Sequence, residues 1–160
     1  MTIVERRLLD LGYVLPKPRI SPHPNRRMAV RAGGVLYLSG HGPYQLSEEV
    51  KAKGRFGEDI SVEEGAKVSR AIAFSMLATV KEVLGDLDQV KQVIRLTGMV
   101  NCAPDFVQIP PIIDGASDVF LDIFGPEAGC HARMVTGMAS LANGICVELC
   151  ADFAIRGVSV

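Results

Sequence analysis

The chain has 160 residues, of which 48% are hydrophobic and 22% are charged. This composition is typical of a folded globular protein and excludes a disordered one. The formal net charge is −1 and aromatic residues make up 6%, so the sequence lacks the basic stripe and the stacking side chains on which nucleic-acid binding depends. The mean hydropathy is positive, at +0.24, which indicates that one surface is buried against a partner.

The beginning of the chain predicts the compartment. The first thirteen residues carry four charged side chains and therefore contain no apolar segment of the kind a signal peptide needs. The longest apolar run, over residues 71–80, is far shorter than the ~18 residues that span a bilayer. We therefore expect a cytoplasmic protein without membrane contact, folded as a single domain over residues 1–160.

Cysteine and histidine spacing favours neither a disulfide nor a metal. The four cysteines contain no Cys-x-x-Cys pair, so we expect reduced thiols that serve in packing. His41, His131 and Cys130 are conceivable metal ligands, but their spacing matches no zinc pattern. The expectation is no metal and no cofactor.

Residues 1–25 are predicted to form a leader helix and a proline-rich connector. Val4, Leu8 and Leu11 have helical spacing, and four prolines between residues 16 and 24 force an extended path. Gly33 and Gly34 then join two predicted strands, 28–32 and 35–39, in a hairpin. Residues 40–60 are polar and glycine-dotted and predict a long loop.

Two helices and three strands are predicted in the rest of the chain. Ser61 and Glu64 fit a capping box for a helix that ends at Leu84, before Gly85. A strand over 93–102 follows, and Pro110-Pro111 begins a second helix that ends at Gly125-Pro126. Two further strands, 132–141 and 145–155, are joined by Ala142-Asn143-Gly144, which predicts a hairpin turn.

The predicted order after the leader helix is β-β-α-β-α-β-β, an α+β fold with a mixed sheet and both helices on one face. The strands look apolar on both sides, through Leu96, Met99, Val100, Met134, Val135, Met138, Ile145, Val147 and Leu149. A sheet face without helices would then be apolar, and we expect it to be buried against other subunits.

Three segments carry a family resemblance. They are Val35-Leu-Tyr-Leu-Ser-Gly40, the helix segment Asp114–Phe124, and His131-Ala-Arg133 followed by Val147-Glu148. Together they resemble the Rid family, the YjgF-like reactive intermediate deaminases with a chorismate-mutase-like fold, in a longer and less characterised branch. The resemblance covers most of the chain from about Ala29 onward.

The resemblance implies a homotrimer with small-molecule sites in the clefts between subunits. Arg133 would clamp a substrate carboxylate, and Glu148 would position or activate the attacking water. Ser39 would donate to the ligand or hold a water, and Gly40 would let the backbone approach the ligand closely. Asp114 and His131 are expected beside the ligand, and His41 is a further plausible neighbour.

Each of these residue types also has an ordinary structural role. Arg133 would then be an exposed or ion-paired strand residue, Glu148 its partner, and Ser39 a hydroxyl bonded to backbone. The neighbouring cluster of Arg26, Arg27 and Arg31 is interpreted either as solvated charges at a strand edge or as an anion site.

The sequence departs from the active deaminases at three positions. Arg26 falls where they have Tyr, Asp114 where they have Asn, and Val135 where they have Cys. A carboxylate at Asp114 about 4 Å from a bound carboxylate would cost about 4 kcal/mol at an effective dielectric constant of ~20. Either Asp114 turns away, Arg26 compensates, or the ligand is not a simple 2-imino acid.

Three functions follow from the resemblance. Characterised relatives hydrolyse enamines and imines to 2-keto acids and ammonia, and this activity is our first hypothesis. The second is a non-catalytic trimer that binds small carboxylate metabolites through Arg133. The third is an L-PSP-type endoribonuclease, against which the charge and the few aromatic residues argue.

Overall fold

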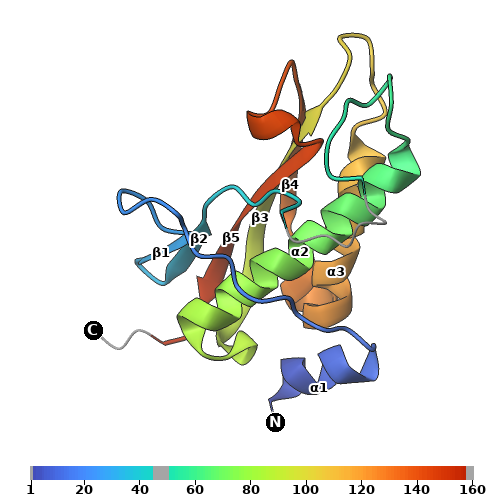
Figure 1. Cartoon of the computed structure of the whole chain (residues 1–160). Helices are drawn as coiled ribbons and strands as arrows, with labels where there is room; N and C mark the ends of the chain where they lie inside the picture. The colour runs from blue at the N-terminus through green and yellow to red at the C-terminus, as the bar shows by residue number, and fades with distance from the viewer. Residues whose placement is uncertain (1, 45–50, 158–160) are drawn as a thin grey trace.

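A five-stranded mixed sheet forms the centre of the structure (Figure 1). The computed structural model describes residues 2–44 and 51–157, so the predicted 40–60 loop lies partly outside the described residues. The strands are β1 (Ala29–Ala32), β2 (Val35–Leu38), β3 (Val90–Asn101), β4 (Ala132–Met138) and β5 (Val147–Ile155), in the spatial order β1-β2-β5-β3-β4. β3 and β4 run parallel, and the other neighbouring strands run antiparallel.

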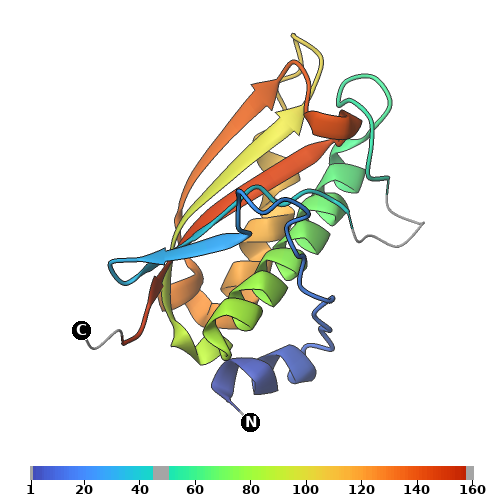
Figure 2. The same cartoon turned by 60° about the vertical axis from the view of Figure 1, so that its left-hand side comes forward.

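Both long helices cover the same face of this sheet (Figure 2). They are α2 (Val62–Leu84) and α3 (Pro110–Gly129), and the short N-terminal helix α1 (Ile3–Asp10) lies beyond one end of them. Two short 3-10 turns, η1 (Leu87–Gln89) and η2 (Ala142–Gly144), precede β3 and β5. The predicted α+β fold is confirmed. Within residues 2–44 and 51–157, no helix is long and apolar enough to cross a membrane.

Local signals account for most element boundaries. The Ser61 hydroxyl accepts from the Glu64 backbone N–H at 3.1 Å, and the Glu64 carboxylate accepts from the Ser61 N–H at 2.8 Å, so the predicted capping box is confirmed. Gly85 ends α2 with φ 78°, a conformation that favours glycine. In α3, Gly125 has φ 80° and interrupts the helix where its end was predicted, but the chain continues helically to Gly129.

The predicted hairpin between the last two strands is wrong. Asn143 and Gly144 do adopt left-handed conformations, with φ 58° and 69°. However, β4 and β5 do not pair, because β3 lies between them and is bonded to β4 on one side and to β5 on the other. The turn therefore carries the chain from the edge strand across to the far side of β3.

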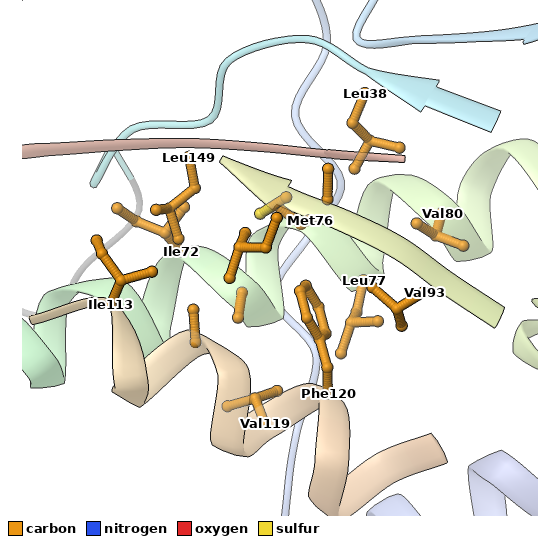
Figure 3. Packing of buried hydrophobic residues seen from close by; sticks show 14 of the residues in the cluster. Leu38, Ile72, Met76, Leu77, Val80, Val93, Ile113, Val119, Phe120 and Leu149 are labelled. Atoms are coloured by element: carbon orange, nitrogen blue, oxygen red, sulfur yellow. The ribbon is translucent and has the colours of Figure 1, made fainter. Parts of the chain in front are cut away.

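The core lies between the sheet and the two helices (Figure 3). Ile72 and Met76 of α2 and Phe120 of α3 belong to one buried cluster, which Leu149 of β5 joins from the sheet side. Each of these four side chains is at most 1% exposed. Burial of one such side chain contributes roughly 1.5–3 kcal/mol, so this layer provides the main stabilisation of the fold.

The uncovered sheet face is mixed, not continuously apolar as predicted. Residues paired in register point to the same side, and Leu96 and Leu149 are fully buried under the helices. Met99 therefore shares the uncovered face with its register partner Glu148, and Thr97 shares it with Met134. Of the residues predicted to be outward-facing and apolar, Met134 is the most exposed large one, at 55%.

Gly115 sets the distance between the helices. A Cβ at this position would lie far inside van der Waals contact with the Ala66 carbonyl oxygen of α2. We expect Gly115→Ala to lower the free energy of unfolding by about 3 kcal/mol, as in overpacked cores. The control Gly85→Ala has free space around it and only a positive φ to oppose it, so its cost should be about 1 kcal/mol. Urea denaturation measures both, and equal losses would contradict the prediction.

Candidate functional site

One cavity, of about 440 Å³, opens beside the end of β2. We call it the arginine cavity because Arg19, Arg26 and Arg27 line it, together with the predicted site residues Ser39, Gly40 and Glu148; the other lining residues are Pro22, Met28, Tyr44, Ala142 and Asn143. Among the described lining residues there are three arginines and one carboxylate, that of Glu148. The cavity therefore has a local excess of positive charge in a chain whose net charge is −1.

Gly40 makes room for the Glu148 carboxylate. A Cβ on Gly40 would overlap a Glu148 carboxylate oxygen, the nearest of three Glu148 atoms it would meet. The glycine was predicted to admit a ligand to the backbone, whereas in this chain it admits a side chain of the site. Glu148 is thereby held at the wall of the cavity, half-buried.

Ser39 ties the proline-rich connector to β2. Its hydroxyl donates to the Arg27 carbonyl oxygen at 2.6 Å, which is the backbone-bonded alternative for this residue. Ser39 is also one of the lining residues of the cavity. Arg19 stacks on the Tyr44 ring, with its guanidinium carbon 3.8 Å from the ring centroid, a cation–π contact that orients the charge.

A second, smaller cavity of about 240 Å³ contains the other predicted residues. Arg133 and His131 line it with Ser117; its remaining lining residues are Asp118, Leu121, Gly129 and Cys130. Arg133 donates to the Asp114 carboxylate at 2.6 Å and to the Ser117 hydroxyl at 3.1 Å. Asp114 therefore does not turn away from Arg133, and Arg26 is not required to compensate its charge, because Asp114 pairs directly with Arg133.

His131 completes this network. Its Nδ1 lies 2.7 Å from the Gly129 carbonyl oxygen, which can only accept, so Nδ1 carries a proton. Its Nε2 lies 3.1 Å from the Ser117 hydroxyl and in the neutral ring accepts from it. Ser117 was missed at the sequence level, although its place three residues after Asp114 put it on the same helix face.

The predicted site residues therefore fall into two groups. Arg133 is the register partner of Leu96 and points to the helix side, whereas Glu148 is the partner of Met99 and points to the uncovered side. The alternative in which Glu148 pairs with Arg133 does not occur within one chain, since Arg133 pairs with Asp114. One chain supplies both groups but does not bring them together.

His41, expected as a plausible neighbour of the site, is buried in the core and is not itself a lining residue of the arginine cavity. Nδ1 contacts the Ser39 carbonyl oxygen at 2.7 Å, and Nε2 contacts the Thr79 hydroxyl of α2 at 2.9 Å. Burial lowers the pKa of His41 below its ordinary value of 6.5, and the Ser39 hydrogen bond only partly opposes this shift. His41 and His131 thus lie in different environments, and among residues 2–44 and 51–157 no cluster suited to a metal ion is found.

The comparisons with known proteins agree with the fold and with the motifs. A family model described as YjgF/chorismate mutase-like, putative endoribonuclease, matches residues 5–153. The chain belongs to this family.

Individual relatives match over nearly the whole chain. Protein TCP17 of Trypanosoma cruzi is 37% identical over 148 residues, covering 91% of this chain and 90% of that protein. The crystal structure of protein Atu1372 of unknown function from Agrobacterium tumefaciens is similar with a TM-score of 0.83 at 35% identity, over 96% of this chain and 94% of that one. A putative endoribonuclease from Shewanella oneidensis has a TM-score of 0.87 at 30% identity, over 96% and 100%.

The buried His41 predicts a pH dependence of stability. Because its pKa is lowered in the folded state, the unfolded chain binds the proton more readily, and stability is lost as the pH falls below about 6.5. Between pH 6.5 and 5 the free energy of unfolding should fall by up to about 1.4 kcal/mol per pH unit. Urea denaturation at several pH values measures this slope. The slope should be smaller in His41→Gln, and an unchanged slope would rule out His41 as its source.

Proposed function

We propose that this protein hydrolyses reactive enamines and imines to 2-keto acids and ammonia, at sites formed between the subunits of a homotrimer. One observation carries the proposal: Arg133 and Glu148 occupy separate cavities that open from opposite sides of the sheet. A carboxylate clamp and a water-positioning carboxylate act on one substrate only if two subunits supply them. The mixed uncovered face, with Met134 exposed beside polar residues, is suited to such a contact.

The reaction needs little machinery. The carboxylate of Glu148 accepts a proton from a water as its oxygen bonds to C2 of the imine, and returns this proton to the imine nitrogen. The C–N bond of the resulting carbinolamine then breaks, the hydroxyl proton moves to the nitrogen, and ammonia leaves the 2-keto acid. Arg133 from the neighbouring subunit holds the C1 carboxylate and so orients C2 toward the water. Family membership and the spacing of Arg133 and Glu148 support these roles.

A non-catalytic trimer that binds small carboxylates is the second candidate. The ion pair between Arg133 and Asp114 keeps this candidate open, because weaker orientation of the substrate carboxylate lowers the rate of a reaction more than it lowers simple binding. The endoribonuclease in the description of the family finds less support, because the arginine cavity has one aromatic residue, Tyr44, among its described lining residues.

A direct assay tests the enzymatic role. 2-Aminoacrylate and longer 2-imino acids are generated in situ, and the release of keto acid is measured with and without the protein. We expect the protein to accelerate release, and Glu148→Gln to lose at least about tenfold of that acceleration. Keto-acid binding without any acceleration would favour the binder instead.

The assembly is tested separately. Light scattering should give three times the chain mass of 17.2 kDa. Met134→Asp places a charge in the proposed interface and should yield monomers, whereas Val107→Asp, at a position 80% exposed in a loop, should remain trimeric. A monomeric wild type at micromolar concentration would contradict both the trimer and the shared site.

The Arg133–Asp114 ion pair predicts that neutralising Asp114 raises the rate of hydrolysis. Asp114→Asn frees the guanidinium and keeps a side chain of the same size, so the rate with 2-imino acids should rise several-fold, and the gain should shrink as salt screens the exposed pair. Kinetics at low and high salt measure this. A loss of activity would make Asp114 a participant in the reaction.

A further inference from the structure

The arginine cavity holds more positive charge than one substrate carboxylate requires. In the proposed function the C1 carboxylate is bound by Arg133, which lies in the other cavity and reaches the substrate from a neighbouring subunit. Arg19, Arg26 and Arg27 nevertheless surround the cavity that contains Glu148. One positive charge would offset the repulsion between Glu148 and an anionic substrate. The three arginines supply more positive charge than this.

None of these three arginines forms an ion pair with another described residue. The ion pairs among the described residues are Arg55–Glu58, Lys81–Glu5 and Arg133–Asp114, and none involves the cavity arginines. Arg26 and Arg27 have exposed side chains, whereas Arg19 is half-buried and held on the Tyr44 ring. The bond from Ser39 to the Arg27 carbonyl oxygen anchors the backbone of this segment to β2, so the arginines and Glu148 line the same cavity.

We infer that the substrate carries a second anionic group on its side chain, and that Arg19, Arg26 and Arg27 bind this group in the arginine cavity. This inference rests on the proposed function and specifies its substrate class: 2-imino acids whose side chain ends in a carboxylate or another small oxyanion. A guanidinium binds such groups through two parallel N–H donors. A volume of about 440 Å³ is within the range of small-ligand sites.

The same cavity disfavours monoanionic substrates with apolar side chains. An apolar group there would displace the water that solvates three guanidinium groups and would return no hydrogen bond. The arginines thus select by charge at the end of the side chain, while Arg133 and Glu148 act at C1 and C2. Arg26 belongs to this selection because it lines the cavity beside Glu148.

Equilibrium binding of the stable keto-acid products tests the inference without relying on turnover. Calorimetry on the full-length protein compares the dianions oxaloacetate and 2-ketoglutarate with the monoanions pyruvate and 2-ketobutyrate. Phosphonopyruvate replaces the distal carboxylate by a phosphonate and so distinguishes the two kinds of oxyanion. Arg26→Gln/Arg27→Gln removes two exposed charges, and Arg31→Gln, on β1 and outside the cavity lining, is the matched control.

The wild type should bind at least one class of dianion about tenfold more tightly than the monoanions. The double variant should lose at least about tenfold in affinity for that dianion and less than about threefold for the monoanions, and Arg31→Gln should change neither. The inference would be overturned if the double variant lost the same affinity for dianions as for monoanions. It would also be overturned if Arg31→Gln lowered the dianion affinity as much as the double variant does. Tighter Arg26- and Arg27-dependent binding of a short single-stranded RNA than of any dianion would overturn it as well.

Failure of the inference and failure of the proposed function give different results. A protein that hydrolyses 2-iminobutyrate without any preference for dianions retains the proposed function and refutes the inference. A protein that binds dianions through the arginines but accelerates no imine hydrolysis retains the binding specificity and refutes the catalytic role.

Discussion

Helix α3 packs on α2 through Gly115, where the absence of a side chain leaves room for the Ala66 carbonyl oxygen. Ser69 strengthens the contact by donating to the Ile112 carbonyl oxygen at 2.5 Å. This close packing keeps both helices on one sheet face, so that their apolar residues form one core with β3 and β5. The opposite face has no cover among the described residues, and Glu148 belongs to that face.

The pleat of the sheet places the candidate site residues on two different faces. Side chains alternate between faces along a strand, so Arg133 and Glu148 lie on opposite sides although β4 and β5 both flank β3. An assembly can unite the two groups because the edge strand β4 and the uncovered face are both accessible. The division also explains why Asp114 and Ser117 can hold Arg133 in place without touching the cavity of Glu148.

Charge is distributed unevenly in a nearly neutral chain. Arg133 shares its charge with Asp114, while the described lining of the arginine cavity retains a positive excess. Asp114 thus lowers the positive charge beside Arg133, and Arg26 raises it beside Glu148.

Local signals in the sequence determined the helices, the strands and the family. The capping box of α2, the Gly85 terminus and the Gly33-Gly34 hairpin involve neighbours within a few residues, whose spacing is visible in the chain. Four results required the tertiary structure: the separation of β4 from β5, the burial of His41 against Thr79, the pairing of Arg133 with Asp114, and the place of Arg19 and Glu148 in the lining of one cavity. Each depends on segments distant in sequence, and the strand order and the pleat, not local propensity, decide which of them meet.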